Sequence, residues 1–214
     1  LKILTKHPNV DILYLYSQSK LKKSINFYSK NFKFKKKLTN VSIMKNHELK
    51  NIDVIFTALP HGEAHLISKK IRSNSVLIDL SADFRIENPI EYKKWYSINH
   101  NAKNLIKNSI YSIPEFTKNK IKKFRIIANP GCYPTSIQLA LVPLINKSLI
   151  ETDDIIIDSK SGYSGAGKSY RIKFNHKNIE NSIFAYGIEK HRHMSELDQQ
   201  FKKIIKNKLE YSFN

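Results

Sequence analysis

The chain has 214 residues with 41% hydrophobic and 11% aromatic content, typical of a folded protein, and its single cysteine excludes an internal disulfide framework. No apolar run approaches the roughly 20 residues of a membrane-spanning helix, while Lys and Arg outnumber Asp and Glu by 37 to 18, a net charge of +19. Because the basic residues are spread along the whole chain, we attribute the charge to compositional drift and expect a soluble cytoplasmic protein with no membrane or nucleic-acid partner.

Short apolar runs predict the buried strands of a parallel sheet. These runs are residues 10–16, 54–59, 76–80 and 125–128. A short helix over residues 63–71 would separate the second and third strands, an order typical of an α/β doubly wound sheet. Further on, residues 155–158 predict another strand, and residues 195–209 predict an amphipathic helix with Ser195 as its N-cap.

The start of the chain is unusual for a nucleotide-binding domain. Such a domain normally opens with a strand and a glycine-rich turn, whereas residues 1–7 resemble the end of a helix that leads into the run at residues 10–16. The chain also stops soon after its last helix. We therefore expect a fragment, or a domain that lacks its first strand.

The single cysteine, Cys132, lies where a strand passes into a helix. A cysteine in an apolar sequence is usually an inert core residue. Here, however, residues 129–131 form a turn after the strand, and Pro134 suits the first turn of the helix that follows. Unpaired N–H groups and the helix dipole at this position favour a thiolate and could also stabilise an oxyanion. Pro143 should kink or end this helix early.

A nucleophilic cysteine needs a proton carrier, and the segment KHRHMSEL offers His191, His193 and Glu196. Two histidines that are two residues apart share a face only on a strand. The sequence also offers no third ligand at a matching spacing, so a metal site is disfavoured. We therefore expect a catalytic histidine beside Cys132, with the other histidine and Glu196 orienting the substrate or the ring.

Residues 161–169, SGYSGAGKS, match the Walker A pattern and follow the strand predicted at residues 155–158. The residues after this motif lack the helical stripe that a phosphate-binding helix requires. A glycine-rich loop that lines another kind of active site is therefore favoured over a nucleoside triphosphatase. His61, the segment DLSADFR at residues 79–85, Tyr111 and Glu115 also lie at or near strand ends, where ligand crevices form.

The motifs ANPGCYPT, ALPHG, DLSADFR, YSIPEF, DSKSGYSGAGKS and YGIEKHRHMSEL, taken in this order, resemble those of the N-acetyl-gamma-glutamyl-phosphate reductases of arginine biosynthesis. The resemblance extends over nearly the whole chain. It implies that Cys132 attacks the acyl phosphate and that NADPH reduces the thioester to a semialdehyde, with His191 as the acid/base group. It also implies a set of substrate-binding residues: His193, Glu196, Ser161, Gly162, Ser164 and Gly165.

The cofactor that the resemblance implies is NADP. The implied cofactor-binding residues are Ser17, Ser19, Pro60 and Gly131. The sequence departs from the family at Gln18, which replaces an arginine, so nearby lysines would supply the charge for the ribose phosphate. Because the glycine-rich phosphate loop is not in this sequence, we expect weak binding of NADPH by this chain.

The resemblance implies a partial NADP-binding, Rossmann-like domain over residues 1–128. A partial α+β domain over residues 129–214 would carry the catalytic residues and the interface of a homo-oligomer, a dimer or tetramer. The partner would be a small acyl phosphate. A related acyl-phosphate reductase of lysine biosynthesis is the nearest alternative, and a P-loop NTPase or a basic nucleic-acid-binding protein remain the alternatives of other classes.

Overall fold

The computed structural model describes residues 1–17, 41–162, 165, 182–183, 185–187, 190–205 and 209–213. The chain forms two compact units, Leu1–Ile52 and Asp53–Asn214. Because the sheet and the site residues discussed below lie mostly in the second unit, that unit carries most of the functional argument.

The first unit contains two short 3-10 helices, η1 (Leu4–Lys6) and η2 (Glu48–Asn51). The strand predicted at residues 10–16 is wrong over most of its length: Tyr16 forms only an isolated parallel bridge with Ser42. A strand needs hydrogen-bonded partners along its length, and among the described residues only Ser42 pairs with this segment, at Tyr16. The hydroxyl of Tyr16 donates to Glu48 at 2.9 Å, which ties this bridge to η2.

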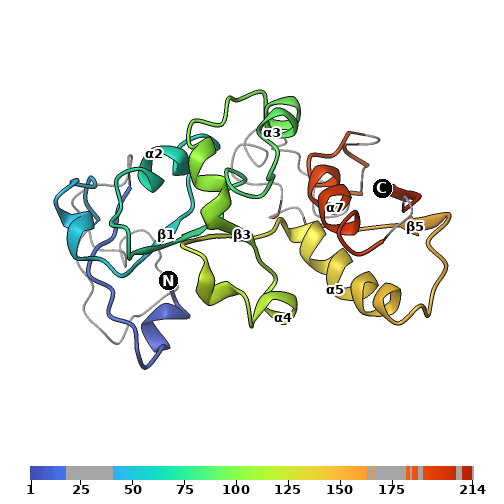
Figure 1. The fold of residues 1–214 in the computed structure, drawn as a ribbon, viewed down its shortest axis with the longest axis horizontal. Helices are drawn as coiled ribbons and strands as arrows, with labels where there is room; N and C mark the ends of the chain where they lie inside the picture. Colours follow the sequence, from blue (N-terminus) through green and yellow to red (C-terminus); the bar gives the residue numbers. More distant parts are fainter. Residues whose placement is uncertain are drawn as a thin grey trace. The chain divides into compact units, whose positions relative to one another are not determined.

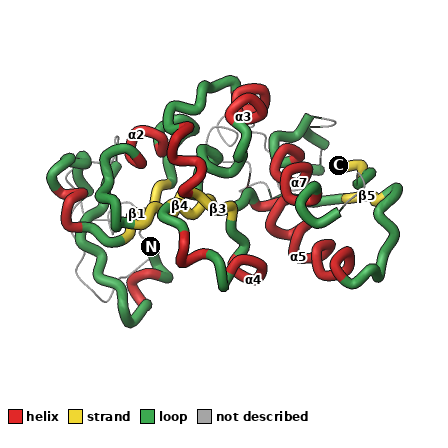
Figure 2. Tube along the Cα trace, in the orientation of Figure 1, coloured by secondary structure: helices red, strands yellow, loops and turns green. Residues whose placement is uncertain are grey.

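A four-stranded parallel sheet forms the centre of the first part of the second unit (Figure 2). Its strands are β1 (Val54–Thr57), β2 (Val76–Asp79), β3 (Ser109–Tyr111) and β4 (Ile126–Ala128). The order β1-β2-β4-β3 confirms the predicted α/β fold class and three of the predicted strands. The register aligns the last residues of all four strands, so their carboxyl ends meet at one edge of the sheet.

Helices flank this sheet, with α2 and α3 on one side of the strands and α4 on the other in Figure 1. They are α2 (Ala64–Ser68), α3 (Pro89–Tyr96) and α4 (Pro114–Thr117), with the 3-10 helices η3 (Lys103–Asn108) and η4 (Ile121–Lys123). Helix α2 is shorter than the predicted 63–71. Helix α3, which we did not predict, begins at a strong signal: the Asn88 side chain accepts from the N–H of Ile90 at 2.8 Å, and Pro89 follows it.

The remainder of the unit packs two helices against a pair of parallel strands. These elements are α5 (Cys132–Asn146), β5 (Ile155–Ile157), α7 (Met194–Phe201) and β6 (Tyr211–Phe213). Their apolar side chains form one buried cluster, whose members are Tyr133, Ile137, Val142, Ile157, Leu197, Phe201, Leu209 and Phe213. This cluster holds the starts of α5 and α7, where the candidate nucleophile and histidines lie, in one compact unit.

Two predictions about these helices need correction. Helix α7 ends at Phe201 rather than residue 209, and Ser195 is not its N-cap, because its hydroxyl donates backwards to the carbonyl oxygen of Arg192 at 2.6 Å. Such a bond within the first turn leaves the serine inside the helix. Helix α5 continues for three residues past Pro143, so this proline does not end it at once.

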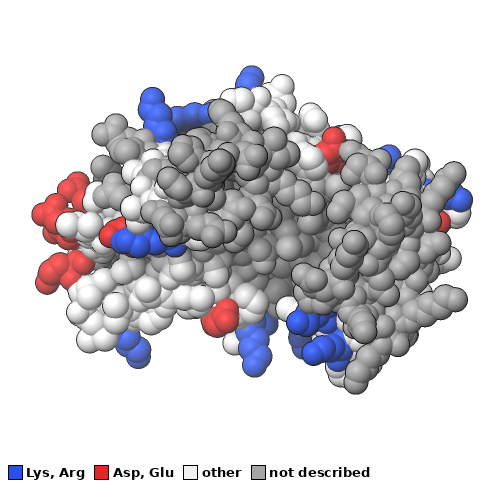
Figure 3. All heavy atoms as spheres, turned by 180° about the vertical axis from the view of Figure 1, so that it is seen from behind, with Lys and Arg blue, Asp and Glu red and all other residues white. Residues whose placement is uncertain are grey.

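On the face drawn in Figure 3, the described residues form no single basic stripe. In Figure 3, Lys and Arg side chains lie at several separate places, with acidic side chains among them. No helix in the described part of the chain is both long enough and apolar enough to cross a membrane.

Candidate functional site

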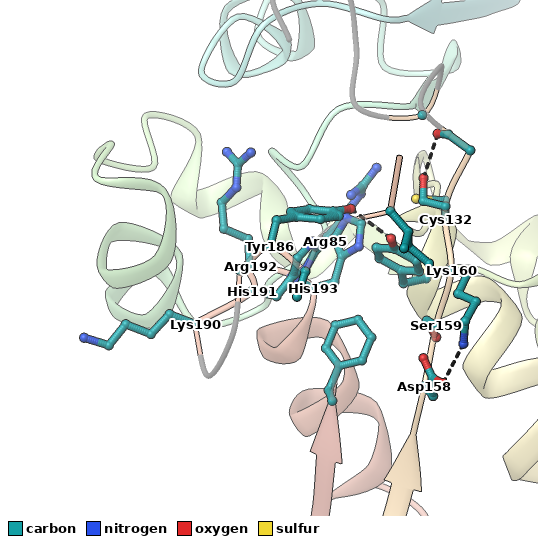
Figure 4. A pocket seen from close by; sticks show the side chains of 18 of the residues that line it. Arg85, Cys132, Asp158, Ser159, Lys160, Tyr186, Lys190, His191, Arg192 and His193 are labelled. Carbon is teal, nitrogen blue, oxygen red and sulfur yellow. Dashed lines mark hydrogen bonds and ion pairs between the residues drawn. The ribbon is translucent and has the colours of Figure 1, made fainter. Parts of the chain in front are cut away.

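One cavity of about 760 Å³ collects most of the predicted catalytic and substrate-binding residues (Figure 4). Cys132, His191 and His193 line it together, although about sixty residues of sequence separate the cysteine from the histidines. The described residues of the predicted substrate loop also line it: Ser161, Gly162 and Gly165. Several lining residues were not assigned a role from the sequence: His61, Arg85, Tyr96, Tyr133, Tyr186, Arg192 and Phe213.

Cys132 is the first residue of α5, as predicted, and its side chain is exposed. Strand β4 ends at Ala128, and the N–H of Asn129 still donates to the Asp79 carbonyl oxygen at 2.8 Å, which extends the β2–β4 ladder by one bond. Gly131 then acts as the N-cap in an extended conformation, and its carbonyl oxygen accepts the helix-type bond from Thr135 at 3.0 Å. The sheet and the helix together therefore fix the backbone of the cysteine.

The imidazole of His191 lies among aromatic rings. Three rings meet it edge to face at centroid distances of 5.4 to 5.5 Å, those of Tyr133, Tyr186 and Phe213. Gly187 permits this packing, because a Cβ there would lie 2.9 Å from Cδ2 of His191. The hydroxyls of Tyr186 and Tyr133 are joined by a 2.9 Å hydrogen bond, which closes the aromatic surround. This packing limits the movement of the ring.

The hydrogen bonding of His191 assigns its tautomer. The main-chain N–H of His193 donates to Nδ1 of His191 at 3.1 Å. Since Nδ1 accepts, the neutral ring carries its proton on Nε2. Burial, and after it the charge of Arg192, lower the pKa of His191 below its ordinary value. At neutral pH the residue is therefore a neutral imidazole with an Nε2–H donor.

His193 is packed more tightly than His191. A Cβ at Gly131 would lie only 2.4 Å from Nε2 of His193, so only glycine fits beside this ring. Burial, followed by nearby His191 and two arginines, lowers the pKa of His193 to about 3. Its Nε2 lies 3.9 Å from Glu196, and its buried Nδ1 has no hydrogen-bond partner among the described residues.

Glu196 is fully buried and joins four segments. Its Oε1 accepts from Nη1 of Arg85 at 3.0 Å. Its Oε2 accepts from the N–H of Gly131 at 2.9 Å and from the hydroxyl of Tyr111 at 3.0 Å. Burial raises the pKa of the Glu196 carboxyl, whereas Arg85, the Gly131 N–H and the Tyr111 hydroxyl lower it. With three donors on two oxygens, the carboxylate form suits this environment.

This geometry differs from the prediction that Glu196 contacts the substrate. Its side chain is 0% exposed, and protein groups occupy both carboxylate oxygens. The N–H of Gly131 is likewise bonded to Glu196, so it is not available as the oxyanion donor that the helix N-terminus suggested. The sequence showed a glutamate near the histidines, but not that Arg85, Tyr111 and Gly131 would converge on it.

The DLSADFR segment, for which the sequence indicated only a place near the crevice, organises the loops at the edge of the sheet. Asp83 accepts from the N–H of Gly62 at 2.7 Å and that of Ala64 at 2.9 Å, at the start of α2. It also accepts from the hydroxyl of Tyr92 on α3 at 2.8 Å. These bonds hold the loop from which Arg85 reaches Glu196.

The predicted cofactor-binding residues are not brought together within one unit. Ser17 belongs to the first unit, where its N–H donates to the carbonyl oxygen of Ser42 at 3.1 Å. Pro60 and Gly131 belong to the second unit, in the turns that follow β1 and β4. Ser19, and with it Ser164 of the predicted substrate loop, lie outside the described residues.

The carboxyl edge of the sheet is the expected position of a bound cofactor. Thr57, Asp79 and Ala128 end neighbouring strands in register, and ligands of open parallel sheets bind outside such ends. Pro60 and His61 follow the end of β1, and Nδ1 of His61 is buried without a hydrogen-bond partner among the described residues. An unpaired buried polar atom at this edge suits a polar ligand. No described group of three or more His, Cys, Asp or Glu side chains is arranged to hold a metal ion.

Comparison with known proteins identifies similar sequences over the whole chain. Residues 1–124 match the family model of the semialdehyde dehydrogenase NAD binding domain, and residues 132–214 match that of the semialdehyde dehydrogenase dimerisation domain. An N-acetyl-gamma-glutamyl-phosphate reductase of Clostridium botulinum is 44% identical over 100% of the chain and 62% of its own length. That of Clostridium novyi is 38% identical over 99% of the chain and 62% of its own length.

A plant protein is similar over the same region. The probable chloroplastic N-acetyl-gamma-glutamyl-phosphate reductase of Arabidopsis thaliana is 38% identical over 99% of the chain, which covers 53% of that protein. The chain thus spans about half to three-fifths of the length of these relatives.

Proposed function

The chain belongs to the semialdehyde dehydrogenase family, and on this basis we propose that its protein reduces N-acetyl-L-glutamyl 5-phosphate to N-acetyl-L-glutamate 5-semialdehyde, with release of phosphate, in arginine biosynthesis. The similarity to proteins named for this reaction supports the choice of substrate. The observation that carries the proposal is the placement of Cys132, at the start of α5, in one cavity with the neutral imidazole of His191.

The proposed chemistry begins with the thiolate of Cys132. Its sulfur forms a bond to the acyl carbon, and the bond from that carbon to the phosphate oxygen breaks, which leaves a thioester on the protein. The Nε2–H of His191 donates to oxygen atoms that gain negative charge in this step, because Nδ1 is already occupied by the His193 N–H. His193 and the loop of Ser161, Gly162 and Gly165 form the walls that orient the acyl chain.

The cofactor in this proposal is NADP, bound at the carboxyl edge of the sheet by the turns that contain Pro60 and Gly131. When bound, its reduced form supplies the hydride that turns the thioester carbon into an aldehyde carbon. Collapse toward the aldehyde returns the sulfur of Cys132 to a thiolate. The preference for NADP over NAD is part of the proposal, as are Ser17 and Ser19 as ribose-phosphate contacts.

We predict that Cys132→Ser in the intact protein abolishes the reverse reaction, the phosphate- and NADP-dependent oxidation of the semialdehyde. The serine hydroxyl is a far weaker nucleophile without a dedicated base, so the rate should fall by about 10³-fold or more. Formation of NADPH, measured by its absorbance, checks this outcome. The matched control is Ser136→Ala, an exposed hydroxyl on the same helix, which should keep full activity.

Two results would contradict the proposal. Activity retained by Cys132→Ser would remove the cysteine from the mechanism. Turnover of the six-carbon homologue of the semialdehyde, with none of the five-carbon compound, would assign the protein to lysine biosynthesis instead.

A further inference from the structure

Two guanidinium groups line the cavity, and they differ in what they contact. Arg85 donates to Glu196 and to two main-chain carbonyl oxygens at 2.8 and 3.0 Å, so its donors are directed into the protein. Arg192 is exposed, and no ion pair joins its side chain to a carboxylate within the described ranges. Its Cζ instead lies 5.6 Å from the ring centroid of Tyr96.

The Tyr96 ring gives Arg192 a fixed support. The ring belongs to the last residue of α3, and this tyrosine is only 8% exposed. An aromatic ring attracts the flat face of a guanidinium group. The N–H groups lie at the edge of the guanidinium, so stacking on the ring leaves them able to donate hydrogen bonds. Arg192 is therefore oriented, but its donors remain available to a ligand.

The same ring contacts a second polar group of the cavity wall. His61 meets Tyr96 edge to face at 5.0 Å, and its Nδ1 is buried with no hydrogen-bond partner in the described part of the chain. Burial and the charge of Arg192 both lower the pKa of His61, which is consistent with the two side chains being close. A neutral imidazole can donate a hydrogen bond to an oxyanion. Such a bond would satisfy the unpaired nitrogen.

Arg192 lies away from the reacting sulfur. In Figure 4, Arg192 and Lys190 lie on one side of the two site histidines, and Cys132 lies on the other. The leaving phosphate of an acyl phosphate is attached to the carbon that Cys132 attacks, so it must lie at the cysteine. An anion that binds at Arg192 therefore belongs to a different part of the bound molecules.

We propose that Arg192, supported by Tyr96 and accompanied by His61, forms an anion subsite for a carboxylate or phosphate group that is remote from the reacting carbon. The guanidinium fork matches the oxygens of both groups. The inference rests on the proposed function, whose substrate and cofactor each carry such a group: the carboxylate of the N-acetylglutamyl unit and the phosphates of NADP. Both groups are anions that accept hydrogen bonds through oxygen, and the experiment distinguishes between them.

The test is the steady-state kinetics of Arg192→Gln in the intact protein, in the direction of semialdehyde oxidation. Loss of a charge-assisted, bidentate contact should raise one KM by about 10- to 100-fold and leave kcat and the KM for inorganic phosphate nearly unchanged. A higher KM for the semialdehyde assigns the subsite to the substrate carboxylate, and a higher KM for NADP assigns it to a cofactor phosphate. Arg192→Lys, which keeps the charge but not the fork, should recover part of the loss.

The matched control is Lys94→Gln, which removes one positive charge from the exposed face of α3, where the lysine pairs with Glu91 at 3.6 Å. This variant should leave both KM values unchanged. Unchanged KM values for semialdehyde and NADP in Arg192→Gln would overturn the subsite. An effect confined to kcat, or to the KM for inorganic phosphate, would overturn it as well.

A second readout does not depend on turnover. Alkylation of Cys132 by iodoacetamide can be followed by mass spectrometry of the peptide that contains it, because Cys132 is the one cysteine among these 214 residues. N-acetyl-L-glutamate or NADP should slow the alkylation of the unsubstituted protein, and Arg192→Gln should need a higher concentration of the same compound. If this difference is found in a protein that does not oxidise the semialdehyde, the proposed function fails and the subsite stands. Equal protection of both proteins would overturn the subsite.

Discussion

At the scale of single residues, the feature that most changes the view of the site is the buried carboxylate of Glu196. It holds the N–H of Gly131, the residue before the nucleophile, and it receives Arg85 and Tyr111 from two other segments. If the charge of Glu196 were removed, the buried guanidinium of Arg85 would have no anionic partner. Loss of one partner of a buried ion pair strongly destabilises the folded state. We therefore infer that Glu196 positions the cysteine loop through its bond to the N–H of Gly131.

We predict that Glu196→Gln lowers the free energy of unfolding by about 3–5 kcal/mol. Urea denaturation of the intact protein, followed by tryptophan fluorescence, measures the loss. Glu87→Gln is the matched control, because Glu87 makes an exposed ion pair with Lys203, and such pairs contribute about 0–1 kcal/mol. Equal losses in the two variants would show that the buried network is not a distinct source of stability.

The two histidines show which residue properties were visible in the sequence. The spacing of His191 and His193 excluded a shared helical face, and the structure places both in the loop before α7. The lowered pKa values of the two histidines could not be predicted, because their main cause is burial against segments that are distant in the sequence. The tautomer of His191 could not be predicted either, because it depends on a loop conformation that turns Nδ1 toward the N–H of His193. Arg192 itself was visible between the histidines, but its stacking on Tyr96 of α3 was not.

At the scale of elements, the junction between β4 and α5 combines three constraints. The strand is fixed by pairing with both β2 and β3, and the helix starts at Cys132 with Gly131 as its cap. The space beside Gly131 is filled by the ring of His193, which comes from the segment before α7. The backbone conformation does not require glycine here, because a φ of −65° is open to any residue. Glycine is needed because a side chain would have no space beside the ring of His193.

We predict that Gly131→Ala displaces His193 or the start of α5. The added Cβ would meet Nε2 of His193 at 2.4 Å, and overpacking of this kind typically destabilises by about 1–3 kcal/mol. Semialdehyde oxidation should also decrease, because Cys132 directly follows the displaced residue. Thermal denaturation and the NADPH assay check the two effects.

The control for this variant is a substitution on the same helix that adds no atom and removes only an exposed hydroxyl, which donates to the Tyr133 carbonyl oxygen one turn back. Ser136→Ala, which we also use as the control for the nucleophile, should change neither quantity. A Gly131→Ala protein with unchanged stability and activity would show that the ring of His193 has room to move.

At the scale of the whole molecule, the second half of the chain combines exposed apolar side chains with a match to a dimerisation domain. Ile156 on β5 is 77% exposed and Leu149 is 68% exposed, and both lie in the region that matches a dimerisation domain. Single exposed apolar side chains are common on protein surfaces, so it is the match to a dimerisation domain that singles out this region. We propose that the protein is a homo-oligomer that uses this region.

Ile156→Lys should shift the oligomer toward monomer, because each copy would place an unpaired charge in an apolar contact. Sedimentation velocity over a range of concentrations measures the shift. Ile90→Lys is the matched control: Ile90 is 76% exposed, on α3 and outside the dimerisation region, so its substitution should leave the assembly unchanged. An equal effect of both variants would argue for nonspecific association.

The sequence by itself determined the class of fold and the candidate chemistry, because these depend on local patterns. Continuous apolar runs predicted β1, β2 and β4, and the turn at residues 129–131 before Pro134 placed Cys132 at a helix start. The run at residues 10–16 shows the limit of this argument. It has the same composition as the true strands, but a strand forms only where a neighbouring segment supplies a ladder, and that partner is not encoded locally.

Only the tertiary structure decided the environment of each site residue. Glu196 became a buried carboxylate because Arg85, Tyr111 and Gly131 from three distant segments converge on it. Arg192 remained available for a ligand because its support is the face of Tyr96 rather than a carboxylate. Charge state, burial and hydrogen-bond partners arise from contacts between segments, so a one-dimensional pattern can name the reactive groups, and packing assigns what each of them can do.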